Sequence, residues 1–237
     1  MKRILTTLTQ KWPEYLLEIL VLIIGIYGAF AVEEWNEDRK WKKETIKITK
    51  SLNSEFIKNE QELQQVLTNI GVQFDTGIRL MELIGASKED IHQANPDSLL
   101  YSFIDGTLYT PTTYTLQDIS NAGRSQLIQS EELLHLVYEW QAQFEHMKEN
   151  FAGLDGKIEQ ELVPFLVKNY SMKDIDRYGP LKWDTQTKLD IDKLSIFQNI
   201  VFENDMDDLL YRIEVYRTTI LRMSEIQNEI IKLTETI

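Results

Sequence analysis

The chain has 237 residues, a net charge of −13 and 43% hydrophobic residues, and it contains no cysteine. This composition excludes a largely disordered protein, and the missing cysteines exclude disulfides and thiolate metal sites. The acidic balance argues against nucleic-acid binding, because phosphate contacts need clustered Lys and Arg, and the one basic cluster covers only residues 39–43.

Residues 12–35 carry the pattern of a single membrane-spanning helix. An apolar run from Ile19 to Val32 is flanked by aromatic residues typical of the lipid headgroup level, namely Trp12, Tyr15 and Trp35. A helix of this length spans about 35 Å, which matches a hydrocarbon core with its interfaces. We therefore predict a basic N-terminal tail over 1–11, a transmembrane helix in membrane lipid over 12–35, and a helical-bundle domain over 36–237. The alternatives are a cleavable signal peptide, with Ala29-Phe30-Ala31 as the cleavage pattern, and a buried soluble helix.

Basic residues lie on both sides of the predicted span, so their number does not choose an orientation. Four acidic residues within 33–38 leave the N-terminal flank as the side with a clear net positive charge. This favours a single-pass membrane protein with its N-terminus in the cytoplasm and its large C-terminal domain outside the cytoplasm.

Three residues of the span share one helix face at spacings of seven and four, namely Glu18, Gly25 and Ala29. Small residues at such spacing let two helices approach closely, and a carboxyl group on the same face can bond a partner helix. The pattern predicts a homo-oligomer or a membrane-complex partner. The alternative is that Glu18 only reaches to the headgroups.

Beyond the span, apolar residues recur at three- and four-residue steps in three long stretches, over 46–84, 133–165 and 206–233. Each predicts an amphipathic helix, with Ser130 and Asn204 as caps of the second and third, Gly71 and Gly77 as bends in the first, and Pro164 as a kink or end. Turn and cap residues predict short helices near 96–103 and 115–122. The expected fold is all-α: a single N-terminal transmembrane helix extending into an antiparallel bundle of three long helices plus short helices. We expect the second long helix to run back toward the membrane and the third away from it.

The segment between the first two long helices is rich in aromatic residues and is followed by one cation. We expect a distal binding surface here, with aromatic walls suited to an anion or small organic ligand, formed by Tyr101, Phe103, Tyr109, Tyr114 and Arg124. The alternative is that the aromatic side chains plug one end of the bundle.

Motifs for chemistry are scarce. Glu132 and His135 have the Glu-x-x-His spacing of di-metal bundles, but such sites need a second copy, and the sequence has none. The chain also lacks a glycine-rich phosphate loop and a Gly-x-Ser-x-Gly elbow. We therefore predict no catalytic, cofactor-binding or metal-binding residues, and a protein that is not an enzyme.

The sequence Glu18-Ile19-Leu20-Val21-Leu22-Ile23-Ile24-Gly25-Ile26, followed by Glu33-Glu34-Trp35-Asn36-Glu37-Asp38-Arg39-Lys40, resembles the anchor of an uncharacterised family of small single-pass bacterial membrane proteins abundant in Bacteroidetes. Its members typically show Gly-Glu before an Ile/Val/Leu run, then Ile-Gly-Ile and Asn-Asn-Trp-Asn-Glu-x-Arg-Lys. The segment 114–123 with Leu127-Ile128 is similar to the family's Leu-x-x-Ser-x-Gly-x-x-x-Leu-Ile. This chain departs from the pattern before Glu18, where the glycine is missing, and at Glu33-Glu34, where the family has an amide pair. Together with the orientation favoured above, the resemblance implies a retained single-pass anchor in the bacterial inner membrane, with a cytoplasmic N-terminus and a periplasmic C-terminal domain. It brings no established activity.

Together these patterns favour a non-enzymatic, membrane-anchored helical bundle that serves as an extracytoplasmic interaction or ligand-sensing module with an unknown ligand. The alternative is a cytoplasmic-facing scaffold or accessory subunit of a larger membrane complex, with residues 39–43 at the anionic leaflet.

Overall fold

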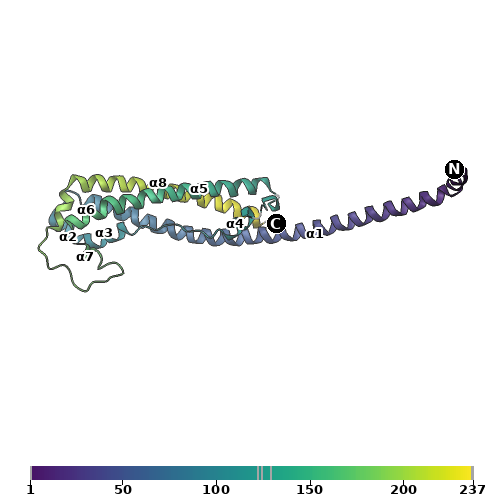
Figure 1. Ribbon diagram of the computed structural model, residues 1–237. Helices are drawn as coiled ribbons and strands as arrows, with labels where there is room; N and C mark the ends of the chain where they lie inside the picture. Colours follow the sequence, from purple (N-terminus) through teal and green to yellow (C-terminus); the bar gives the residue numbers. More distant parts are fainter. Residues whose placement is uncertain (1, 122, 124, 129, 236–237) are drawn as a thin grey trace.

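The structure is a computed structural model that describes residues 2–121, 123, 125–128 and 130–235, and this part of the chain is all-helical (Figure 1). The principal helices are α1 (Lys2–Glu82), α5 (Glu131–Lys157) and α8 (Ile200–Glu235). The shorter elements are α2 (Lys88–Gln93), α3 (Pro96–Ile104), α4 (Tyr114–Asn121), η1 (Ser125–Leu127), η2 (Ile158–Leu162), α6 (Val163–Asn169), α7 (Met172–Ile175) and η3 (Lys193–Gln198).

Helix α1 has two parts with different surroundings. Its N-terminal part extends alone from the bundle (Figure 1), and its large apolar side chains from Leu16 to Trp35 are exposed. Within the described residues, α1 is the one helix long and apolar enough to cross a membrane, by length and composition. From Thr45 onward the same helix buries a stripe of side chains against the bundle, including Leu52 and Phe56. The membrane-type segment and the first bundle helix are therefore one unbroken helix.

Helix α8 packs along both other long helices and runs opposite to each. Against α1, Asn53 Nδ2 donates to Thr234 Oγ1 at 2.8 Å near the C-terminal end of α8. Against α5, Trp140 Nε1 donates to Gln227 Oε1 at 3.0 Å, while Asn150 Nδ2 donates to Thr219 Oγ1 at 2.8 Å. Helices α1 and α5 therefore run in the same direction, and α8 returns between them.

This course corrects the order expected from the sequence, in which the second long helix ran back toward the membrane. The return is made instead by residues 105–113, which form no helix and run along α1. Tyr109 Oη donates to the carbonyl oxygen of Asn59 at 3.2 Å, and Thr115 N, at the start of α4, donates to Glu55 Oε2 at 2.8 Å. Because the chain has already returned toward the end of the bundle from which the N-terminal part of α1 extends, α5 starts there and runs away from it (Figure 1).

The two glycines expected to bend α1 do not interrupt it. A Cβ atom built on Gly77 would lie 2.5 Å from Phe103 Cε2 and 2.7 Å from Leu210 Cδ2, so glycine allows α3 and α8 to approach α1 closely. A Cβ atom on Gly71 would meet nothing within 4 Å. Gly77 thus serves packing, and nothing in the bundle requires Gly71.

The helix ends agree in part with the predicted caps. Ser130 Oγ accepts the hydrogen bond from Leu133 N at 3.2 Å and caps α5, as predicted. The prediction for Asn204 was wrong, because this residue lies inside α8. Asn199 caps the helix instead, and its Oδ1 accepts a hydrogen bond from Val201 N at 2.8 Å. Before Pro164 the helix passes through the π-helical turn η2 and continues as α6. The wider turn fits because proline lacks the N–H that a regular helical bond would use.

Candidate functional site

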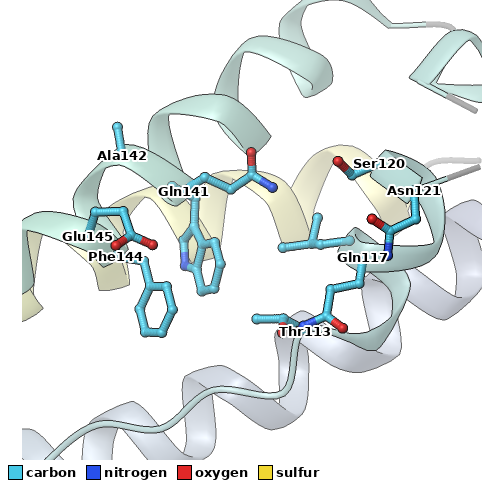
Figure 2. A pocket seen from close by; sticks show the side chains of 10 residues that line it. Thr113, Gln117, Ser120, Asn121, Gln141, Ala142, Phe144 and Glu145 are labelled. Atoms are coloured by element: carbon cyan, nitrogen blue, oxygen red, sulfur yellow. Dashed lines mark hydrogen bonds between the residues drawn. The ribbon is translucent and has the colours of Figure 1, made fainter. Parts of the chain in front are cut away.

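A cleft of about 470 Å³ lies between α4 and α5 and is the candidate site (Figure 2). We call it the α4–α5 cleft. It is lined by Thr113, Leu116, Gln117, Ser120, Asn121, Trp140, Gln141, Ala142, Phe144 and Glu145. Its volume falls within the range of small-molecule sites in proteins.

The rim of the cleft is made of amide and hydroxyl groups from both helices. Gln117, Ser120 and Asn121 share one face of α4 because they are three and four residues apart, and Gln141 faces them from α5 (Figure 2). Gln117 Nε2 donates to Thr113 Oγ1 at 2.8 Å. Among the described residues, the side chains of Ser120, Asn121 and Gln141 have no hydrogen-bond partner. These three groups are available to a ligand.

The floor of the cleft is apolar and rigidly held. Leu116 and Trp140 are buried, and Phe144 is half-buried. The Trp140 and Phe144 rings stack with centroids 5.5 Å apart, and Phe56 of α1 meets the indole edge-on at 5.2 Å. The floor is therefore continuous with the core of the bundle.

The α4 wall is held by polar side chains of α1. Glu55 Oε2 accepts from Thr115 N in the first turn of α4. Asn59 both donates to the carbonyl oxygen of Thr112 and accepts from its N–H, each at 2.8 Å. A carboxylate at a helix N-terminus also interacts favourably with the helix dipole. The helix that carries the exposed apolar segment thus positions one wall of the cleft.

A buried polar network lies behind the floor and joins α1, the 105–113 segment, α5 and α8. Gln227, which is 0% exposed, accepts from Tyr109 Oη at 2.8 Å and from Trp140 Nε1 at 3.0 Å. Its Nε2 donates to Glu60 Oε2 at 2.7 Å. Burial, followed by the charge of Glu60, raises the pKa of the Tyr109 hydroxyl. The network fixes α8 against both α1 and α5.

A second polar cluster lies at the opposite end of the bundle and holds residues 176–192, which form no helix. Lys193 Nζ contacts Asp174 Oδ2 at 2.8 Å and Asp97 Oδ1 at 3.1 Å, and Tyr170 Oη donates to Asp97 Oδ1 at 2.6 Å. Burial acts to raise the pKa of Asp174, but the hydrogen bonds from Lys193 and from Thr187 N hold it below its usual value. Burial and the bond to Asp97 raise the pKa of Tyr170. Each member has a partner, so this cluster is a structural tie.

The residues predicted for the membrane span lie apart from the cleft on the free part of α1. Trp12 and Trp35 are exposed, and so are Glu18, Gly25 and Ala29. The side chain of Tyr15 lies outside the described part of the structure. A Cβ atom on Gly25 would meet nothing within 4 Å, so the single chain has no internal need for glycine there.

The residues predicted for a distal binding surface are spread along the bundle. Phe103 and Tyr109 are buried in the core at 0% and 1% exposure, and Tyr101 packs against Gly179. Tyr114 is 79% exposed, at the end of the bundle from which the N-terminal part of α1 extends. Arg124 lies outside the described residues. The two buried rings belong to the core, as the alternative expected for the aromatic side chains, but the predicted residues do not gather at one end of the bundle.

Sequence reasoning did not select the residues of the cleft rim. The one available pattern was the spacing of Gln117, Ser120 and Asn121 on α4, and it does not reveal that Gln141 lies opposite. Within the part of the chain that the structure describes, no group of three or more His, Asp or Glu side chains is arranged to hold a metal ion. Comparison with protein-family models, with curated proteins and with solved structures returned no match. The resemblance of the anchor and central segments therefore stays a prediction.

Proposed function

We propose that this protein is a non-enzymatic, membrane-anchored module whose helical bundle lies outside the cytoplasm and binds a ligand in the α4–α5 cleft. The observation that carries the proposal is the continuity of α1. Its exposed apolar segment has the dimensions of a membrane span, and its bundle segment positions α4 through Glu55 and Asn59. One helix therefore links the anchor to a wall of the cleft.

The exposed apolar surface of α1 supports the anchor. Side chains from Leu16 to Trp35 are exposed around the whole helix, and an apolar surface of this extent is costly in water. Trp12 and Trp35 mark its two ends at the spacing of the two headgroup layers. Arg39 lies over the Trp35 ring, 4.9 Å from its centroid, and places a cation just beyond the indole.

The orientation is tested with single cysteines, because the chain has none of its own. Lys188→Cys, at an exposed position of the 176–192 segment, reports on the bundle, and Thr7→Cys in the N-terminal tail is its opposite reporter. We expect a membrane-impermeant maleimide to label the Lys188→Cys variant in intact spheroplasts and the Thr7→Cys variant only after lysis. The reverse result would refute an extracytoplasmic bundle.

The exposed basic residues just beyond the span favour a second candidate function. Arg39, Lys40, Lys42 and Lys43 are all exposed and lie within about 12 Å of Trp35 along the helix axis. Such residues suit the anionic cytoplasmic leaflet, where each contributes about 1 kcal/mol of attraction. A scaffold or accessory subunit facing the cytoplasm is the function to adopt if the two reporters give the reverse result.

A further inference from the structure

We infer that the α4–α5 cleft takes an uncharged small molecule that carries one aromatic or branched apolar group beside an amide. This inference rests on the proposed ligand-binding function and adds the chemical class of the ligand.

The apolar part of the ligand is indicated by the floor. Leu116, Trp140 and Phe144 line the cleft with apolar side chains, and the rings of Trp140 and Phe144 stack with their centroids 5.5 Å apart. The indole N–H of Trp140 is already bonded to Gln227, so the floor offers no polar group to a ligand. Burying an apolar group of the ligand there is favourable in proportion to the area removed from water.

The amide is indicated by the rim. A carboxamide side chain offers an acceptor oxygen and two donor hydrogens at once. Gln141 on one side and Asn121 on the other have no partner among the described residues, and Gln117 uses only one donor, in its bond to Thr113. These carboxamides face each other across a cleft whose volume is about 470 Å³. They are complementary to a ligand group that both donates and accepts hydrogen bonds, and an amide does both in one plane.

The absence of net charge is indicated by the ionised groups near the cleft. Among the described lining residues, Glu145 is the one ionisable side chain, and Lys148 Nζ contacts its Oε2 at 2.6 Å. The same ammonium lies 5.0 Å from the centroid of the Phe144 ring. Because these two charges already compensate each other, a charged ligand would lose hydration without gaining a partner.

The test uses three probes that share one ring and differ in charge at pH 6, well below the ordinary α-amino pKa of about 7.7–8.0. N-acetyl-phenylalaninamide is neutral, N-acetyl-phenylalanine is an anion, and phenylalaninamide is a cation. Binding to the full chain in detergent micelles is measured by ligand-observed NMR titration. We expect a Kd of about 1 mM or tighter for the neutral probe, which is ordinary for a ligand of this size, and binding weaker by about tenfold or more for both charged probes.

Variants locate the binding and control for uptake of the probes by the micelle. Gln141→Leu combined with Gln117→Leu removes two of the three rim amides and leaves Asn121, and we expect this variant to weaken binding of the neutral probe by about tenfold or more. Gln143→Leu changes the same residue type on α5 outside the cleft lining and should leave the Kd within about twofold of the unmodified protein. Circular dichroism of each variant verifies that the bundle is folded.

Each outcome has one meaning. Preference for the neutral probe that depends on the rim amides supports the inference. Equal or tighter binding of a charged probe, binding unaffected by the rim variant, or no binding of the neutral probe overturns it. The cysteine reporters decide the membrane orientation independently, so failure of this inference and failure of the proposed topology are distinguishable.

Discussion

Replacing Gln227 by Met should destabilise the bundle while preserving its shape. The two side chains are unbranched and similar in volume, so the packing of α8 against α1 and α5 is retained. The three hydrogen bonds of Gln227, to Tyr109, Trp140 and Glu60, are lost. The perturbation is therefore almost purely polar.

The magnitude follows from which groups lose a partner. The single hydroxyl proton of Tyr109 can turn to the Asn59 carbonyl oxygen, 3.2 Å from Oη, and Glu60 keeps the hydrogen bond from Ser224 Oγ at 2.7 Å. The Trp140 N–H is left buried and unpaired. An unpaired buried donor costs about 1–3 kcal/mol, and a bond to a carboxylate contributes about 1.5–3 kcal/mol. Part of this is offset because Met does not have to be desolvated. We expect a net loss of about 2–4 kcal/mol, which lowers the Tm of a domain of this size by about 5–15 °C.

The assay is thermal unfolding of the full chain in detergent, followed by near-ultraviolet circular dichroism of the bundle aromatic residues. Gln143→Met is the matched control, because that residue has no hydrogen bond to another described side chain and should change the Tm by about 2 °C or less. Trp140→Phe should cost about 1 kcal/mol less in the Gln227→Met background than in the unmodified protein, because the unpaired N–H is then absent. Either of two results would refute the reasoning: a Gln227→Met variant as stable as the control, or a double variant whose loss of stability equals the sum of the losses of Gln227→Met and Trp140→Phe.

Three further outcomes are expected. Gly77→Ala should destabilise the bundle by about 1–3 kcal/mol through overpacking, whereas Gly71→Ala in the same helix should stabilise it by about 0.5–1 kcal/mol, and the paired denaturant midpoints would contradict this if they moved alike. The free energy of unfolding should fall as pH rises above about 10, by about 1.4 kcal/mol per pH unit for each buried tyrosine, because the unfolded chain loses protons that the folded state keeps. The loss continues up to the raised pKa of the folded state, which is about 12 for Tyr216. A flat stability profile between pH 9 and about pH 11 would count against this prediction. The groups concerned are Tyr109, Tyr170 and Tyr216. Gly25→Leu should weaken self-association in detergent if that face joins two copies, and an unchanged cross-linking pattern would argue against such a contact.

The all-helical class and the position of the apolar segment were predictable from the sequence, because they depend on local periodicity. The expected stripe of the first long helix is visible in the structure, where Leu52, Phe56 and Leu63 are fully buried. The cap at Ser130 was predictable for the same reason, since its partner is three residues away.

The direction of the second long helix was not predictable, because it depends on contacts across large sequence separations. The turn-rich segment after α3 has no period of its own, and its course is set by Asn59 and Gln227, which bind Tyr109 from α1 and α8. In the sequence both are polar residues on amphipathic helices, with nothing to mark them as buried. The cleft depends on that course, since it brings α4 against α5, and so it could not be predicted either.

The unbroken path of α1 fixes how the bundle is rotated about the axis of the exposed apolar segment. Residues 36–44 form the exposed shaft between Trp35 and the first buried position, and they raise the bundle by about 14 Å. Each residue added to or removed from this shaft would turn the bundle by about 100° relative to the span and change its height by about 1.5 Å. The length of the shaft therefore determines toward which side of the α1 axis the cleft opens. A neighbouring protein bound to the apolar segment would contact the bundle from one defined side.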